Sequence, residues 1–279
     1  MRILQTIVPA LLPLAQRFLH FCLPNCCLWC DFAVQRPGAQ LCDYCQAALP
    51  RLHWPAGAQA LQLPAVRRGL QSPQFDAVWS LSWYQQPWSH FISAWKLQQD
   101  LACGVMLRQQ LATVLPEWVL HQHYDAVAYV PVHRKRLRER GFNQSRQLAM
   151  TVSCSTDLPL LDLFLAQSHL PHQLGASASA RRAQLRRQFR LRPAVNDWQQ
   201  LPQRILLVDD VLTTGATLNQ LCRLLRKAGV RQIGVVTLAI TPAPGVSTTL
   251  YASQAPYTAP ALYSSPSPLS SPESNNLPK

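Results

Sequence analysis

The segment ILLVDDVLTTGAT at residues 205–217 constrains the fold of this chain more than any other feature of its sequence. Its first four residues are apolar, which is typical of a strand buried in a sheet. Two adjacent acids follow, and a run of Thr, Gly and Ala then marks a tight turn into a helix. This order predicts an α/β unit with a polar site at the carboxyl end of its strand.

The residue types of this segment suit a phosphorylated sugar. Asp209 and Asp210 carry adjacent carboxylates, which can accept hydrogen bonds from the two vicinal hydroxyls of a ribose. The backbone amides of the turn and the N-terminus of the following helix form a cradle for a phosphate. The residues expected in this cradle are Thr213, Thr214, Gly215, Ala216 and Thr217.

The same segment has two other interpretations. An ordinary strand, turn and helix would use these polar residues only to cap the helix. Dinucleotide and ATP sites need a GxGxxG pattern or a Lys after Gly, and they lack the paired acids, so the segment disfavours both classes.

Further strands and helices are predicted on either side of this unit. Strands are expected at 75–84, 124–131, 205–208 and 232–239, and helices at 88–115, 143–152 and 217–228. Strands that alternate with helices favour a doubly wound parallel sheet. We therefore predict an α/β domain over residues 75–240.

Cysteines crowd the first part of the chain in two CxxC pairs separated by eleven residues. The four expected ligands are Cys27, Cys30, Cys42 and Cys45. Two such pairs predict a zinc ribbon over residues 22–50, in which the zinc is structural because four thiolates leave no open position for a substrate. A redox or disulfide pair and an iron–sulfur centre are the alternatives.

Three remaining segments carry little core. Residues 1–21 are expected to form an amphipathic helix rather than a transmembrane segment, because polar residues and prolines interrupt an apolar run shorter than the ~18 residues that a span requires. Residues 51–74 are expected to be a connector, and residues 241–279, rich in Pro and Ser, a disordered tail. We expect a cytoplasmic protein, with peripheral association at the inner membrane left open.

The chain is strongly basic, with 26 Lys and Arg against 13 Asp and Glu. The excess is concentrated in residues 133–192, which hold twelve basic residues against three acids. Such clustering favours an anionic partner, and nucleic acid, a phosphorylated substrate and lipid headgroups all fit it. The basic stretch 134–140 can neutralise a diphosphate or a nucleic-acid backbone, or it can be a solvated loop.

Residues 22–240 resemble the ComF/GntX family of competence-associated, type I phosphoribosyltransferase-like proteins. The segment 205–217 looks like the motif that binds phosphoribosyl pyrophosphate (PRPP) in such transferases. Further similarity lies in the Cys-rich head, in Lys96, in PVHRKRLRERGFNQ at 131–144 and in RRAQLRRQF at 181–189.

This resemblance implies roles for several residues. Asp209 and Asp210 would be the catalytic and ribose-binding acids. Arg134 and Lys135 would lie in a loop near the pyrophosphate, with Mg²⁺ bound to PRPP, and Arg181 would belong to a mobile flap over the donor.

Two functions stay open. The first is a phosphoribosyltransferase that binds PRPP or another phosphorylated ribose, is linked to DNA uptake or use, and transfers to an unidentified acceptor. The second is a non-catalytic accessory of the competence machinery that binds single-stranded DNA and partner proteins and uses the site for ligand sensing.

Overall fold

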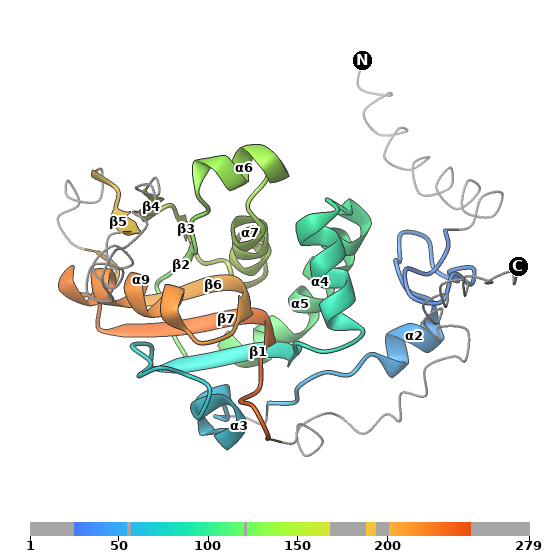
Figure 1. Cartoon of the computed structure of the whole chain (residues 1–279), viewed down its shortest axis with the longest axis horizontal. Coiled ribbons are helices and arrows are strands. Elements are labelled where there is room, and N and C mark those ends of the chain that lie inside the picture. Colours follow the sequence, from blue (N-terminus) through green and yellow to red (C-terminus); the bar gives the residue numbers. More distant parts are fainter. Residues whose placement is uncertain (1–24, 55–56, 120–121, 168–187, 194–200, 247–279) are drawn as a thin grey trace, which may run out of the picture.

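The structure, a computed structural model, describes residues 25–54, 57–119, 122–167, 188–193 and 201–246 (Figure 1). The helix expected at 1–21, Arg181 and the segment 247–279 of the expected tail lie outside the described residues.

A five-stranded parallel sheet forms the centre of the molecule. In spatial order its strands are β1 (Ala77–Trp83), β7 (Gln232–Ile240), β6 (Arg204–Leu212), β2 (Ala126–Tyr129) and β3 (Leu160–Leu161). The predicted parallel sheet is therefore confirmed. The strand expected to end at Val208 continues to Leu212, because Val211 and Leu212 remain paired with β7.

Helices cover both faces of the sheet, as a doubly wound fold requires. The helices α4 (Trp88–Leu97), α5 (Leu101–Val119) and α7 (Gln144–Thr156) pack on one face, and α3 (Pro64–Arg67) and α9 (Ala216–Lys227) on the other. Because successive side chains of a strand point to opposite faces, Leu206 and Val208 join the first core while Ile205 and Leu207 join the second.

The single helix expected over residues 88–115 is wrong, since the structure has two helices, α4 and α5. The chain breaks at Gln99, which has a left-handed backbone with φ of 59°. Asp100 then caps α5, because its side chain accepts hydrogen bonds from the amides of Ala102 at 2.9 Å and Cys103 at 3.1 Å.

The basic stretch expected as a loop forms a helix, α6 (Arg134–Arg140). Arg, Lys, Leu and Glu all favour a helix, and the side chain of His133 caps it by accepting a hydrogen bond from the Lys135 amide at 3.2 Å. Gly141, with φ of 76°, ends it. Asn143 then caps α7 as predicted, accepting from the Arg146 amide at 3.3 Å.

A second, two-stranded antiparallel sheet joins β4 (Phe164–Ala166) to β5 (Phe189–Leu191). The end of the expected flap, residues 188–192, thus lies in or beside a strand. The head contains α2 (Asp43–Ala48), and the connector contains the short 3₁₀ helix η1 (Ala60–Gln62) and α3.

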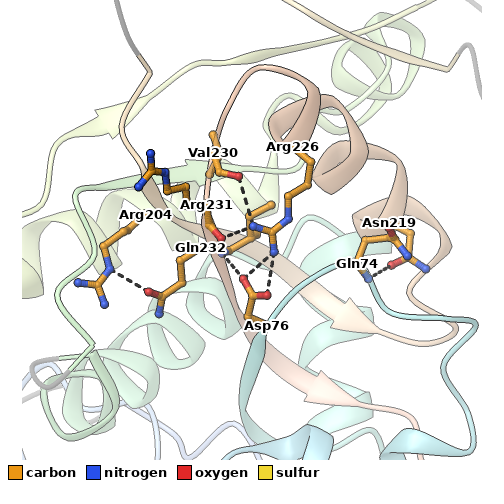
Figure 2. Close-up of polar contacts among 9 residues, drawn as sticks. Gln74, Asp76, Arg204, Asn219, Arg226, Val230, Arg231 and Gln232 are labelled. Carbon is orange, nitrogen blue, oxygen red and sulfur yellow. Dashed lines mark hydrogen bonds and ion pairs between the residues drawn. The ribbon is translucent and has the colours of Figure 1, made fainter.

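Polar contacts fix α9 against the strands at both of its ends (Figure 2). The guanidinium of Arg226 donates to both carboxylate oxygens of Asp76, at 2.8 and 2.7 Å, and also to the carbonyl of Val230 at 3.2 Å. Near the start of the helix, the side chain of Asn219 accepts from the amide of Gln74 at 2.8 Å. These bonds tie both ends of α9 to the segment that leads into β1.

We expect Gly234→Ala to lower the free energy of unfolding by ~2–3 kcal/mol, as an overpacked core does. A Cβ at position 234 would overlap the hydroxyl of the buried Tyr124 and lie 2.5 Å from its Cζ. Denaturant unfolding measures the change. Gly69→Ala is the control, because its Cβ would come no closer than 3.5 Å to any neighbour, and equal stability of the two variants would contradict the account.

Candidate functional site

A cavity of about 470 Å³ opens at the carboxyl ends of β2 and β6. The first turn of α7, helix α6, the β4–β5 pair and the start of α9 surround it. Six of its lining residues carry the chemistry considered below: Lys96, Arg136, Arg140, Ser145, Asp209 and Asp210. The position agrees with the general rule that ligands of open α/β sheets bind at the carboxyl ends of the strands.

The paired acids lie near the C-terminal end of β6, and both line the cavity. Asp209 accepts a hydrogen bond from the Ser145 hydroxyl at 2.9 Å, and its Oδ1 also accepts from the Asp210 amide at 2.9 Å. Asp210 forms an ion pair with Lys96, whose Nζ lies 2.6 Å from Oδ2. The two carboxyls therefore have different partners, a hydroxyl for one and an ammonium for the other.

The environment of Asp209 disfavours its charged form. Burial, together with the nearby Asp210 carboxylate, raises the pKa of Asp209 to about 7, although the Ser145 hydrogen bond acts in the opposite direction. The protonated form of this carboxyl is therefore favoured more than in an exposed aspartate. A ligand that donates hydrogen bonds to it would favour its ionisation.

The turn between β6 and α9, where a phosphate cradle is predicted, lies beside the cavity. Gly215 has a φ of 74°, which favours glycine, and it caps α9 at its N-terminus. Thr213 and Thr217 line the cavity. Thr214 and Ala216 are exposed beside it, and the Thr214 carbonyl accepts a hydrogen bond from the Gln71 amide at 3.3 Å.

The basic wall of the cavity consists of Arg136 and Arg140. Residues four apart lie on one face of a helix, so the helical form of α6 turns this pair toward the cavity together. Arg134 and Lys135, which were expected near the pyrophosphate, are exposed and are not among the described residues that line the cavity.

Sequence reasoning missed three contributors to this site. Ser145 contacts an acid 64 positions further along the chain, and no local pattern signals that contact. Lys96 was part of the family resemblance, but its ion pair with Asp210 depends on tertiary structure. Phe189 reaches the cavity from β5, a short strand with only three residues and therefore a weak periodic signal.

The four predicted cysteines come together in the head. The sulfur atoms of Cys27, Cys30, Cys42 and Cys45 all lie within 4.8 Å of one another, and those of Cys30 and Cys42 are 3.6 Å apart. A tetrahedral zinc with Zn–S bonds of ~2.3 Å places its sulfur atoms ~3.8 Å apart. The cluster therefore fits a structural zinc ion, while Cys26 is exposed and outside it.

The head packs against the α/β domain. The Trp29 ring meets the rings of His90 and Phe91 edge to face, each at a centroid distance of 5.7 Å. The side-chain amides of Gln46 and Gln110 bond reciprocally at 3.1 and 2.8 Å. The cysteine cluster thus shares a core with α4 and α5.

In the described part of the chain, no helix combines the length and the hydropathy that crossing a bilayer requires.

Comparison with known proteins gives one matching family model, the phosphoribosyl transferase domain, over residues 201–249. Competence protein F of Haemophilus influenzae is 34% identical over 173 residues, which cover 61% of this chain and 75% of that protein. Competence protein ComFC of Streptococcus pneumoniae is 29% identical over 155 residues, covering 56% of this chain and 64% of that protein. DNA utilization protein YhgH of Escherichia coli K12 is 28% identical over 230 residues, covering 77% and 90% respectively.

The fold and the matched domain define a phosphoribosyltransferase-like α/β protein, to which a cysteine-rich head is joined. Within that class, the chain belongs to the ComF family.

Proposed function

We propose that the cavity binds PRPP and that its acids, helix terminus and arginines each hold one part of that ligand. Asp209 and Asp210 accept hydrogen bonds from the ribose hydroxyls, and residues 213–217 hold the 5′-phosphate. Arg136 and Arg140 take the pyrophosphate, in place of the Arg134 and Lys135 expected from the sequence. The observation that carries this proposal is the meeting of paired carboxylates, a helix N-terminus and two arginines around one cavity of about 470 Å³.

The charges of the site suit departure of a pyrophosphate. Mg²⁺ bound with PRPP would neutralise part of the negative charge of the diphosphate. Arg136 and Arg140 line the cavity and would stabilise the charge that the leaving group gains. Lys96 balances Asp210, so the two acids do not place a double negative charge beside the ligand. The chain's contribution would be positioning and electrostatic stabilisation.

The names of the relatives, which refer to competence and DNA utilisation, extend the proposal to a biological setting. We assign this chain to the uptake or use of DNA, with a phosphoribosyl group transferred to an acceptor not yet identified. We also propose that zinc occupies the cysteine cluster in a structural role. Two exposed cations on α9, Arg223 and Lys227, line a second hollow and suit nucleic acid, which serves either candidate: as the acceptor in transfer, or as the bound partner of a non-catalytic accessory that senses PRPP.

A measurement of pyrophosphate release distinguishes a phosphoribosyltransferase from a protein that only binds PRPP as a sensor. Transfer predicts Mg²⁺-dependent pyrophosphate release from PRPP when a suitable acceptor is present. Nucleobases, nucleosides and single-stranded DNA form the panel to test, and binding of PRPP without release against any of them would favour sensing.

Replacing Arg136 and Arg140 by alanine is expected to weaken PRPP binding at least tenfold, because charge-assisted hydrogen bonds contribute ~1.5–3 kcal/mol each. Arg134→Ala/Lys135→Ala removes the same charge from the same helix and should change binding by less than about threefold. Calorimetric titration of PRPP with Mg²⁺ into both variants measures the difference. Equal losses would mean that α6 acts through its overall charge, which would contradict the assignment.

A further inference from the structure

A second hollow, of about 560 Å³, lies along the outer side of α9, and we call it the α9 groove. The residues that matter for its chemistry are Phe189, Gln220, Arg223, Leu224, Arg226 and Lys227. Phe189 lines both this groove and the phosphoribosyl cavity. The two sites are therefore adjacent, with one aromatic ring between them.

One side of α9 connects the phosphoribosyl cavity with the α9 groove. Thr217 lines the phosphoribosyl cavity, and the groove residues of α9 follow at intervals of three or four positions, through Gln220 and Arg223 to Lys227. Such spacing places them on one side of the helix. At 1.5 Å per residue, the distance from Thr217 to Lys227 along the helix is ~15 Å, which is enough for more than one nucleotide.

The charges of this groove are not all equivalent. Arg226 is occupied by its bidentate contact with Asp76, which Figure 2 shows, so it serves the fold. Arg223 and Lys227 are exposed, and no carboxylate of the described residues forms an ion pair with either of them. These two cations are placed to meet anions from solvent.

The uncharged groups of the groove suit the binding of a nucleobase. Phe189 is half-buried and offers a ring on which a base can stack. The side-chain oxygen of Gln220 is buried and has no hydrogen-bond partner among the described residues. Because Gln220 lines the groove, rotation of its side chain would turn this oxygen toward a base and let it accept a hydrogen bond from an amino or imino group. An aromatic ring, a buried acceptor and two free cations in one groove match the parts of a nucleotide.

We propose that the α9 groove binds a short single strand of nucleic acid, with a base against Phe189 and Gln220 and phosphates against Arg223 and Lys227. This inference deepens the proposed function, and rests on it, in placing the strand at the acceptor side of the phosphoribosyl cavity. The binding of the strand itself depends only on the groove. The proposal goes beyond a general basic surface, because it names two cations and excludes Arg226.

Fluorescence anisotropy with a labelled oligothymidylate tests the proposal on the full chain. Arg223→Ala/Lys227→Ala should weaken binding at least tenfold at low salt. It should also reduce the slope of log affinity against log salt by about 1.4, since each phosphate contact on a single strand contributes about 0.7. Phe189→Leu should weaken binding about tenfold through lost stacking, with the salt slope unchanged.

Two controls make the result specific. Arg67→Ala/Arg68→Ala removes two exposed cations at the C-terminal end of α3 and should leave binding within about twofold of the wild type. Thymidine monophosphate should compete only weakly, and competition equal to that of the oligonucleotide would overturn the assignment to a strand. Thermal unfolding of each variant shows that it remains folded.

Titration of PRPP into the same proteins separates this inference from the proposed function. If PRPP binds while oligonucleotide affinity is the same in the wild type and in Arg223→Ala/Lys227→Ala, the groove assignment is wrong and the PRPP site stands. If the oligonucleotide binds through Arg223 and Lys227 but PRPP does not bind, the groove stands as a nucleic-acid site without its acceptor role.

Discussion

Cys45→Ser is expected to abolish zinc binding and to unfold the head of the protein. Cys45 is buried within the four-sulfur cluster, and removing one thiolate leaves an incomplete tetrahedral set. Structural zinc contributes on the order of 10–16 kcal/mol in small zinc modules, which is as large as the whole stability of an ordinary domain. Over the residues that the structure describes, from 25 on, the head has one six-residue helix and little other core to replace the zinc.

The consequence should reach beyond the head. Trp29 packs on Phe91 of α4, so loss of the head would expose that helix and lower the melting temperature of the whole chain. Measurement of bound zinc and of amide hydrogen exchange in α4 tests both steps. Cys26→Ser is the matched control, because Cys26 is exposed beside the cluster and should retain one zinc per chain. A Cys45→Ser protein with full zinc content and unchanged melting would contradict the assignment.

Asp209→Asn should make the folded protein more stable at pH 8 while it removes ligand binding. The pKa of Asp209 is raised to about 7 from an ordinary 3.8, mainly by burial and then by Asp210, so the folded state disfavours the ionised carboxyl. Stability from the protonated form is fully present below the ordinary value and is lost as pH rises toward 7. Asparagine resembles the protonated form at every pH and avoids that loss, which is at most ~4 kcal/mol.

A gain in stability on Asp209→Asn would show that the carboxylate is kept at a cost to stability, as is typical of a functional acid, whereas a structural acid would lose stability on the same change. The stability advantage of Asp209→Asn over the wild type should be small near pH 4 and should grow to its full value above pH 7. Denaturant unfolding at several pH values measures it. Asp157→Asn, which changes an exposed acid at the end of α7, should show no such growth. A stability advantage that does not depend on pH, or a loss of stability at pH 8, would contradict the conclusion that burial and Asp210 disfavour the ionised form of Asp209.

Local patterns in the sequence were enough to predict the central fold. The apolar run before Asp209, the turn at Gly215 and the helix after it are each a contiguous signal, and the structure has a strand, a turn and a helix in that order. The cysteine pairs were equally readable, because ligand spacing within a CxxC unit is set by the short chain between the sulfurs. The structure brings these four sulfurs together as expected.

Features that depend on tertiary contacts could not be predicted in this way. The loop predicted for the basic run 134–140 is an exception, because its residue types favour a helix and the caps at His133 and Gly141 are local signals. That helix determines why Arg136 and Arg140, rather than Arg134, line the cavity. The partners of the acids, Ser145 and Lys96, come from other elements of the fold and carry no local signal.

Calorimetric titration of PRPP with Mg²⁺ into the wild type and into Asp209→Asn/Asp210→Asn tests the central proposal most directly. We expect a saturable heat in the wild type that depends on Mg²⁺, and no binding heat in a variant that remains folded. The absence of heat in the wild type, or equal binding by the variant, would contradict the assignment of this cavity to PRPP.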